Sequence, residues 1–521
     1  MKEDKLMETL NLLKKLNSEG FKISYEMKNL SLKFPKGKEI NEDLINELKA
    51  NKDSLILYFE NYAGKIKLTD TKEKEKKIKK IPFEGEDYYE ITPVQKYWVD
   101  DTIDYKYKQQ NRKHGTVVIT YEVFGPLLIK AFNNAVSYIV NRHESLRTTF
   151  HEINANYYMR INKYNKAYIP EYWDFQSKPK NDAQIKKIIE FDNHNFDLKK
   201  GPLFLARLLK IKEKHFEFSL KIHHVIFDTV SDGILKRDLF TAYKAFSQNK
   251  IPNLPALKFQ YKDNLASINN YIKNNYNHHK DYWDKLYRGL PEPLQIPIDS
   301  IDNQIEHSFG EKEMIEFPKR LINRLSLIAK KNTVSLFVIL QATFKAYLCY
   351  KTGQSDILIG TYIFGRDHSN TENQIGCYAK TVLIRTIFNR KDSFREIVKK
   401  VAKSNEDMKN YWAFSLMEKT KEMLSHDESL IKSFWKINLQ YYDLLQKKSL
   451  ISDSLGSDLK FLIKRNQDKS IIGFIMQLTF IRSAEQLWLQ IEYDSSQYDS
   501  LTIKNLISDY VNFANEHCRI N

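Results

Sequence analysis

Residues 222–233 read Ile-His-His-Val-Ile-Phe-Asp-Thr-Val-Ser-Asp-Gly, so two adjacent histidines are followed by an aspartate four residues after the second. Upstream, apolar and polar residues alternate over 216–222, a period of two that predicts a half-buried strand. Because successive strand side chains point to opposite faces, we expect His224 on the apolar face and His223 on the other. Apolar residues at helical spacing over 235–246 predict that a helix follows the turn.

The turn brings a titratable ring and a carboxylate together, but these residues alone leave two interpretations open. A histidine on an apolar face is most often a satisfied core residue. Alternatively, His224 is a reactive ring, and Asp228 orients it or anchors an arginine. Ser231 and Asp232 are both suited to be the N-cap of the following helix.

The composition predicts a protein with more than one core. The chain has 521 residues, of which 42% are hydrophobic and 13% aromatic. It has no run of 18 or more apolar residues, so no membrane-spanning helix is predicted. The three cysteines, Cys349, Cys377 and Cys518, lie far apart and predict neither a disulfide framework nor a metal site. We therefore expect a cytoplasmic protein with reduced thiols that acts away from membranes.

The formal net charge is +16, which could attract nucleic acid, an anionic membrane or acidic proteins. Apart from a run at 72–80, the lysines are spread along the chain, and we find no nucleic-acid-binding motif. We interpret the charge as a solvated, lysine-rich surface, with acidic protein partners as the functional alternative and nucleic acid as a distant one.

The chain divides into a small N-terminal unit, a charged linker and a large region. In residues 1–62 a helical pattern ends at Gly20, two alternating segments predict a hairpin, and helical patterns follow, which gives an αββαα order. Residues 63–84 contain the run of lysine and glutamate and predict a tether. The large region begins at about residue 85.

The histidine motif, with Asp228 and Ser231, resembles the His-His-x-x-x-Asp-Gly signature of the condensation domains of non-ribosomal peptide synthetases. Other stretches are similar to motifs of that family in the expected order: Ile-Thr-Pro-Val-Gln-Lys-Tyr-Trp at 91–98, Arg-His-Glu-Ser-Leu-Arg-Thr-Thr-Phe at 142–150, Tyr-Lys-Asp at 261–263, and the stretches 359–366 and 375–382. The late motifs of the family are poorly matched at 410–419 and 434–440. The resemblance covers about 85–515 and is strongest in its first two-thirds.

This resemblance implies an α/β fold of two chloramphenicol-acetyltransferase-like lobes that form a V-shaped condensation domain, with the N-lobe at 85–265 and the C-lobe at 266–521. The family joins a carrier-bound acyl thioester to an amine in a tunnel between the lobes, with the second histidine, here His224, at its centre. The resemblance implies no metal and no cofactor bound to the chain itself, because the phosphopantetheine is carried by the partner carrier protein.

The resemblance implies that His224 is the catalytic residue and leaves its role open. The ring could accept the proton of the attacking amine, or it could hold the amine and stabilise the developing tetrahedral charge. We expect Asp228 to organise the turn through an arginine, with Arg366 as the candidate partner and Ser231 in support. We expect His223 to pack or hydrogen-bond locally.

One position departs from the family pattern, since Thr229 stands where the motif has glycine. Glycine tolerates a positive φ that a β-branched residue disfavours. Either the turn takes an ordinary conformation or the site is altered. The first motif position is His223 and not aspartate, which disfavours a heterocyclising relative.

The N-terminal unit resembles the docking domains of peptide synthetases of the tubulysin type. Such domains add the C-terminal tail of a partner as an extra strand at an exposed sheet edge. The edge would be flanked here by Lys22, Lys28 and Lys33, which implies an acidic tail on an upstream synthetase. The alternative is a small capping subdomain with no ligand.

Beyond a helical pattern at about 501–516 the sequence shows no adenylation domain and no carrier protein. With residue 521 as the natural end, the thioester and the amine must both come from elsewhere. A free small amine as acceptor would release the peptide as a terminal amide. This layout resembles the free-standing terminal condensation proteins of the rhabdopeptide type, and we expect the chain to act as a monomer.

Two other interpretations stay open. The first is a non-catalytic docking and carrier-binding platform with a drifted motif, which Thr229 and the weak late motifs favour. The second is an epimerising relative that shares the histidine motif, although a docking unit directly before the fold favours condensation.

Overall fold

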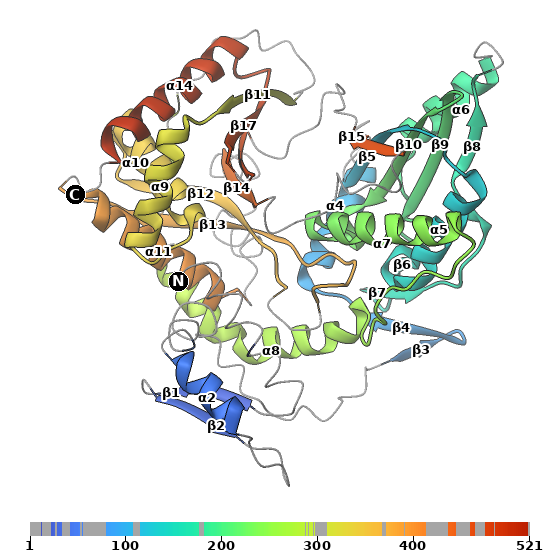
Figure 1. Cartoon of the computed structure of the whole chain (residues 1–521), viewed down its shortest axis with the longest axis horizontal. Coiled ribbons are helices and arrows are strands. Elements are labelled where there is room, and N and C mark those ends of the chain that lie inside the picture. The colour runs from blue at the N-terminus through green and yellow to red at the C-terminus, as the bar shows by residue number, and fades with distance from the viewer. Residues whose placement is uncertain are drawn as a thin grey trace. The chain divides into compact units, whose positions relative to one another are not determined.

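A computed structural model gives the fold of the chain (Figure 1). It describes residues 12, 22–26, 29–33, 42–52, 55, 80–107, 115–176, 182–286, 288–289, 291–294, 296, 310–366, 371–389, 391–412, 436–443, 459–463, 475–483 and 485–518. The chain separates into two compact units, Met1–Lys76 and Lys77–Asn521, and we describe each by itself.

The described part of the first unit contains a hairpin and a helix. Strand β1 (Lys22–Glu26) pairs antiparallel with β2 (Asn29–Lys33), with Lys22 opposite Lys33, as the alternating sequence predicts. Helix α2 (Glu42–Ala50) follows. Lys28 and most of the two flanking helices predicted for this unit lie outside the described residues.

The second unit has two lobes, as the fold class predicts. The first lobe contains β3 (Ile81–Phe83), β4 (Glu86–Glu90), α4 (Pro93–Tyr107), β5 (Thr116–Phe124), α5 (Ile129–Arg142), η1 (Glu144–Arg147), β6 (Thr148–Ile153), β7 (Asn156–Ile161), η2 (Lys166–Tyr168), β8 (Glu171–Asp174), α6 (Asp182–Asn193), β9 (Phe204–Lys212), β10 (His215–His223), η3 (His224–Ile226) and α7 (Thr229–Ser247). These strands form a four-stranded sheet in the order β3-β4-β7-β6 and most of a five-stranded sheet in the order β15-β5-β10-β9-β8, in which β15 (Lys460–Ile463) comes from later in the chain.

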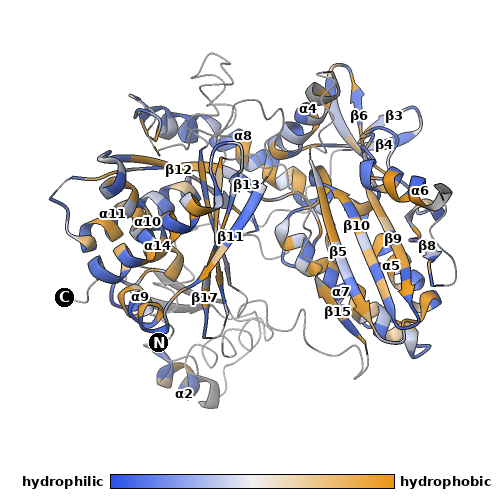
Figure 2. Ribbon diagram, turned by 90° about the horizontal axis from the view of Figure 1, so that it is seen from above, coloured by the Kyte–Doolittle hydropathy of each residue, from blue (hydrophilic) through white to orange (hydrophobic). Residues whose placement is uncertain are grey.

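The core of the first lobe lies between the five-stranded sheet and helices α5 and α7. Phe132 of α5 packs edge-on against Phe218 of β10, and Phe240 of α7 packs against Tyr121 of β5. Figure 2 shows apolar residues concentrated along β5, β10 and β9. The strand that carries the histidine motif is therefore central, with a paired strand on each side.

The second lobe is built on a six-stranded sheet in the order β11-β17-β16-β14-β12-β13. Its elements are β11 (Gly310–Glu316), α9 (Lys319–Lys331), α10 (Leu336–Thr352), β12 (Asp356–Ile363), β13 (Lys380–Ile387), α11 (Phe394–Asn410), β14 (Ile437–Asp443), β16 (Met476–Arg482), β17 (Leu487–Asp494) and α14 (Ser500–His517). Strand β15 (Lys460–Ile463) leaves this lobe and pairs with β5 of the first. Helix α10 is buried over most of its length.

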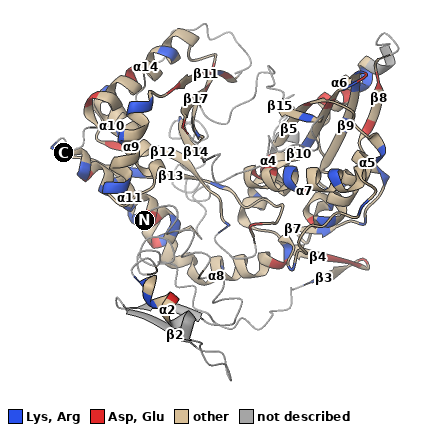
Figure 3. Ribbon diagram, viewed as in Figure 1, with Lys and Arg blue, Asp and Glu red and all other residues tan. Residues whose placement is uncertain are grey.

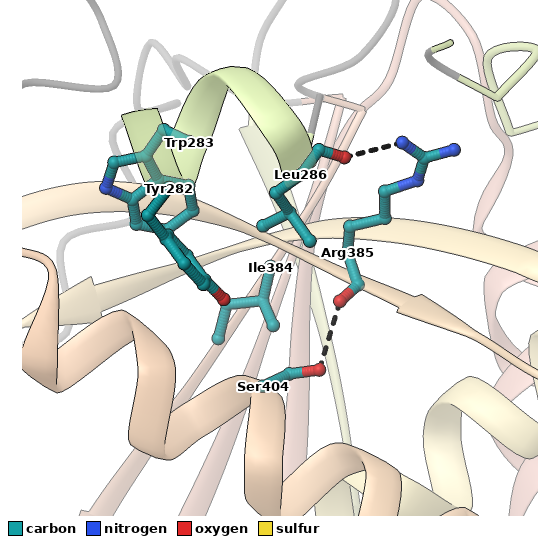
Figure 4. A pocket seen from close by; sticks show the side chains of 6 residues that line it. All are labelled: Tyr282, Trp283, Leu286, Ile384, Arg385 and Ser404. Carbon is teal, nitrogen blue, oxygen red and sulfur yellow. Dashed lines mark hydrogen bonds between the residues drawn. The ribbon is translucent and has the colours of Figure 1, made fainter. Parts of the chain in front are cut away.

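Helix α8 (Tyr261–Leu286) joins the two lobes, and the lobe boundary expected at residue 265 falls inside it (Figure 1). Its last turn attaches to the second lobe because Arg385 donates to the carbonyl of Leu286 at 2.6 Å and pairs with Asp356. A hollow of about 10 Å³ lies beside this contact, close to the smallest space that one water molecule needs. Figure 4 shows the side chains that line it: Tyr282, Trp283, Leu286, Ile384, Arg385 and Ser404.

Charges are dispersed over the described residues of both lobes. Figure 3 shows lysines and arginines on α7, α9, α11 and α14.

Among the described residues no single helix is long and apolar enough to cross a membrane, although α9 and α10, bent by 108° at the break between them, together have the length and composition of a broken span.

Lys345 is a buried cation in the middle of α10. Its side chain is fully buried, and its Nζ donates to the carbonyl of Ile384 at 3.1 Å and to Thr386 Oγ1 at 2.7 Å. Burial lowers the pKa of Lys345 to about 7, although the charge of Asp356 acts in the opposite direction. Burial of the charged form of Lys345 therefore lowers the free energy of unfolding near neutral pH.

We expect Lys345→Met to remove a pH dependence of stability. Between pH 7 and the ordinary lysine pKa of about 10.4 the unfolded chain holds the proton and the folded chain does not. The wild type therefore gains free energy of unfolding as pH rises, by up to about 1.4 kcal/mol per pH unit. The variant should lack this gain in urea unfolding at pH 7–9.5, while Lys330→Met, on the exposed side of α9, should keep it. Equal pH profiles in wild type and Lys345→Met would contradict the assignment.

Candidate active site

The two histidines of the motif have different surroundings. Strand β10 ends at His223, and His224 begins the short helix η3. The strand register that predicted an apolar-face position for His224 therefore does not reach it, and that part of the prediction is wrong. His224 is half-buried, whereas His223 is 1% exposed.

His223 is held by local hydrogen bonds, as expected. Its Nδ1 accepts from the N–H of Val225 at 3.1 Å, so the neutral ring carries its proton on Nε2. Nε2 lies 3.1 Å from Thr102 Oγ1, which itself donates to the carbonyl of Trp98. The edge of the ring also contacts Phe196. His223 thereby fixes the backbone where the strand turns into η3.

Helix α4 positions His224 from the side. The ring of His224 stacks on Trp98 with the centroids 4.7 Å apart and the planes 11° apart. Gln95, one turn earlier on α4, donates to the carbonyl of Val225 at 3.3 Å. The stretch at 91–98 thus supplies both an aromatic platform for the histidine and a clamp for the turn after it.

Gly115 holds the other side of the turn, and no sequence motif had singled it out. Its carbonyl accepts from the N–H of His224 at 2.7 Å. It has a positive φ of +65°, and a Cβ here would lie 2.9 Å from Nε2 of His223. Glycine is therefore required both by the backbone conformation and by the close approach of the ring. The available signal was a lone glycine directly before a strand.

Asp228 is the N-cap of α7 and is only 4% exposed. Its Oδ1 accepts from the N–H and the hydroxyl of Ser231, both at 2.7 Å, and from Arg366 Nη2 at 2.8 Å. Its Oδ2 accepts from the N–H groups of Tyr378 at 3.2 Å and Ala379 at 3.3 Å. The expected pairing of Asp228 with Arg366 is confirmed, and the carboxylate also holds a segment of the second lobe.

That segment, the described residues 371–379 before β13, is bound to the first lobe at several points. The N–H of Gly376 donates to Ser231 Oγ at 3.0 Å, and Ser145 Oγ donates to the carbonyl of Ile375. Tyr261 Oη donates to the carbonyl of Cys377. A Cβ on Gly376 would lie 2.2 Å from the ring of Tyr261, so only glycine fits against this buried tyrosine.

Thr229 takes the ordinary conformation that the sequence left open. It is the first residue of α7, and it is not among the described non-glycine residues with positive φ. The motif position thus does not require a left-handed backbone in this chain. Thr229 is exposed, so its side chain lies free of the core.

A second buried carboxylate, Asp238, supports the same helix, and no sequence motif had singled it out. It accepts from Arg142 Nε at 3.0 Å and from Arg237 Nε at 2.8 Å, and it contacts His143 Nε2 at 3.0 Å. Burial alone would raise the pKa of Asp238, but His143 and Arg237 lower it overall. The available signal was a charge at a helical position between two core leucines, Leu235 and Leu239.

The described residues offer no group of three or more His, Cys, Asp or Glu side chains that could hold a metal ion. Burial raises the pKa of the Cys377 thiol, which lies beside the Asp228 cluster. Among the described residues of this site, His224 is suited to proton transfer or hydrogen bonding, because its imidazole stacks on Trp98 and its backbone is held by a hydrogen bond to Gly115.

Comparison with known proteins identifies the class. A family model described as Condensation domain matches residues 85–518, so the chain belongs to the condensation domain family. Members of this class in non-ribosomal peptide synthesis form amide bonds.

Among curated relatives, tyrocidine synthase 3 of Brevibacillus parabrevis is 32% identical over 263 residues, 50% of this chain and 4% of the synthase. Bacitracin synthase 1 of Bacillus licheniformis is 27% identical over 383 residues, 73% of this chain and 7% of the synthase. The chain therefore spans less than a tenth of the length of these two relatives.

Solved structures show the same fold at low identity. The X-domain in its complex with OxyB from teicoplanin biosynthesis has a TM-score of 0.67 at 18% identity, over 82% of this chain and 93% of that one. The first condensation domain of the calcium-dependent antibiotic synthetase, with a substrate analogue, has a TM-score of 0.63 at 15% identity, over 83% and 96%. The two-lobed condensation fold expected from the sequence is thus confirmed.

We expect Asp228→Asn to lower the free energy of unfolding by about 3–5 kcal/mol, because it leaves the buried guanidinium of Arg366 without its counter-charge. Asp509→Asn, in an exposed pair with Lys351, should cost about 0–1 kcal/mol. Urea unfolding of both variants measures the difference. A loss in Asp228→Asn no larger than in Asp509→Asn would show that the pair does not hold the two lobes.

Proposed function

We propose that the chain is an acyltransferase that joins a carrier-bound acyl or peptidyl thioester to an amine, with His224 as the catalytic residue. The observation that carries this proposal is the presentation of His224. Its backbone is fixed by Gly115 and its ring by Trp98, yet the side chain is only half-buried. A core histidine would instead resemble His223, which is buried and held by its neighbours.

The chemistry needs one proton to be moved. A free alkylamine resembles lysine, with a pKa of about 10, so it is mostly protonated at neutral pH. A desolvated site favours the neutral amine, whose nitrogen attacks the thioester carbonyl. The new C–N bond forms, the C–S bond breaks, and the carrier thiolate leaves. In one role, His224 accepts the proton lost by the nitrogen and can pass it on to the thiolate. In the other role, His224 stabilises the charge of the tetrahedral intermediate, and the thiolate takes the proton directly.

The acceptor and the partners belong to the same proposal. The thioester arrives on the phosphopantetheine of a separate carrier protein, and the acceptor is a free small amine, so that the product leaves as a terminal amide. The N-terminal hairpin recruits the acidic C-terminal tail of an upstream synthetase as a further strand. Lys22, Lys28 and Lys33 supply the complementary charge.

A non-catalytic platform is the second candidate, and Thr229 in the motif is the observation that favours it. The two candidates differ in what happens to a thioester. A platform binds the carrier without consuming its acyl group, whereas an acyltransferase consumes it only when an amine is present.

We expect His224→Ala to reduce amide formation by about 10²–10⁴-fold while leaving carrier binding unchanged. Mass spectrometry of a loaded carrier, with and without a panel of primary amines, measures the product. His517→Ala, at the exposed end of α14, should behave as wild type. If wild type and His224→Ala consume the acyl thioester at the same rate, the non-catalytic platform is the correct interpretation.

Charge reversal of Lys22, Lys28 and Lys33 to glutamate should weaken the binding of a fluorescent peptide rich in aspartate and glutamate. Raising the salt concentration should weaken the wild-type complex in the same way, because exposed charges are screened. Fluorescence anisotropy measures both effects, with Lys330→Glu on α9 as the control. Equal affinities for wild type and the triple variant would leave the hairpin without a docking role.

A further inference from the structure

One side of helix α4 contacts three consecutive residues of the histidine motif, 223–225. The contacting side chains are spaced three and four residues apart, which places them on one side of a helix: Gln95, Trp98 and Thr102. The two outer side chains bind the neighbours of His224, at the Val225 carbonyl and at His223 Nε2. The middle contact, the stack of Trp98 on His224, therefore acts on the imidazole itself.

The stack places the ring of His224 face to face with the indole of Trp98. The centroids are 4.7 Å apart and the planes 11° apart, within the separation of about 6 Å at which an aromatic face attracts a cation. The face of an aromatic ring carries the negative part of its quadrupole. A protonated imidazole in this position therefore gains more from the indole than a neutral imidazole does. The ring nitrogens lie at the edge of the imidazole, so the stack itself occupies neither of them.

The identity of the platform distinguishes His224 from other stacked histidines of the described residues. His215 stacks on Phe124 with centroids 4.4 Å apart, and His517 stacks on Phe513 at 4.3 Å. Tryptophan offers a stronger cation–π face than phenylalanine does. Trp98 also packs against the core of the first lobe, so its face is in place before any charge forms on the ring.

We propose that the indole face of Trp98 stabilises the protonated ring that forms when His224 accepts the proton of the attacking amine. The proposal rests on the proposed function and selects the first of the two roles given there for His224. The proton lost by the amine nitrogen moves to a ring nitrogen as the C–N bond forms. The imidazolium then gives this proton to the thiolate that leaves when the C–S bond breaks, and the ring returns to its neutral form. Trp98 acts through the ring of His224 and is a positioning residue.

Other titratable groups lie on the elements packed against His224. On α4, Lys96 pairs with Asp100 at 2.8 Å, and beside the turn Asp228 pairs with Arg366 at 2.8 Å. Further titratable side chains described on α4, on the turn with the start of α7, and on the segment 371–379 are Tyr97, Asp101, His223, Asp232, Cys377 and Tyr378. A substitution of Trp98 leaves all of these groups in the chain, so a change in the titration of His224 reports on the stack.

The test compares Trp98→Leu, which has no aromatic face, with Trp98→Phe, which keeps a weaker one. One measurement is the midpoint pH at which diethyl pyrocarbonate modifies His224, followed by mass spectrometry of its peptide, because the reagent reacts with the neutral ring. It needs no amide formation, and the midpoint, unlike the rate, does not depend on how exposed the ring is. The other measurement is the pH dependence of kcat/KM for methylamine with a loaded carrier. Thermal unfolding checks that each variant is folded.

We expect Trp98→Leu to lower the modification midpoint of His224 by about 0.4–1.5 pH units, because the protonated ring loses its cation–π partner. Above that midpoint, kcat/KM should fall by about 2- to 30-fold, and its acid limb should move to lower pH with the modification midpoint. Trp98→Phe should lie between wild type and Trp98→Leu in both measurements. The control is Phe513→Leu, which removes the face beneath the exposed ring of His517 and should leave both measurements on the site at their wild-type values.

The outcomes separate this proposal from the proposed function. If wild type forms amides but the midpoint of His224 is the same in all Trp98 variants, Trp98 is only a packing residue and the proposed function stands, whether or not the variants lose activity. If the midpoint shifts but wild type uses no amine, the effect of Trp98 on the ring is upheld and the proposed function fails. With neither a shift nor amide formation, both are wrong. If Trp98→Leu does not fold, the midpoint of Trp98→Phe decides.

Discussion

The carboxylate of Asp228 is the interaction on which the site depends. It accepts five hydrogen bonds, two from the first turn of its own helix and three from the second lobe. One buried charge thus starts α7 and joins the lobes at the same point. A buried carboxylate is stable only where such donors surround it. The second-lobe segment must therefore be in place before the turn that carries His224 is fully stable.

This coupling explains how the surrounding residues act. Gly115, Gln95 and Trp98 hold His224 from the first lobe alone, whereas Arg366 and the N–H groups of 378 and 379 act on the turn from the second. A relative shift of the lobes would change the Asp228 contacts first, and the turn would follow. The backbone turn that carries the imidazole is in this way linked to the contact between the lobes.

Local sequence patterns predicted those features of the site that depend on residues close together in the chain. The alternation over 216–222 gave β10, the apolar spacing after 233 gave α7, and the motif order identified Arg366 as the partner of Asp228. The predicted apolar-face position of His224 was wrong, because β10 ends at His223 and the alternation does not continue to residue 224. Gly115 and Asp238 could not be placed, since their contacts join segments separated by about 100 residues in the chain. Such contacts leave no periodic signal in the sequence.

Thr229 shows that a motif position occupied by glycine in the family does not need the backbone conformation that only glycine favours. A glycine in a signature usually suggests a conformation that other residues avoid. Here the position is the first of a regular helix, where threonine fits without strain. A residue with a side chain is therefore accommodated at 229 while the turn, the Asp228 cap and the lobe contact stay as they are.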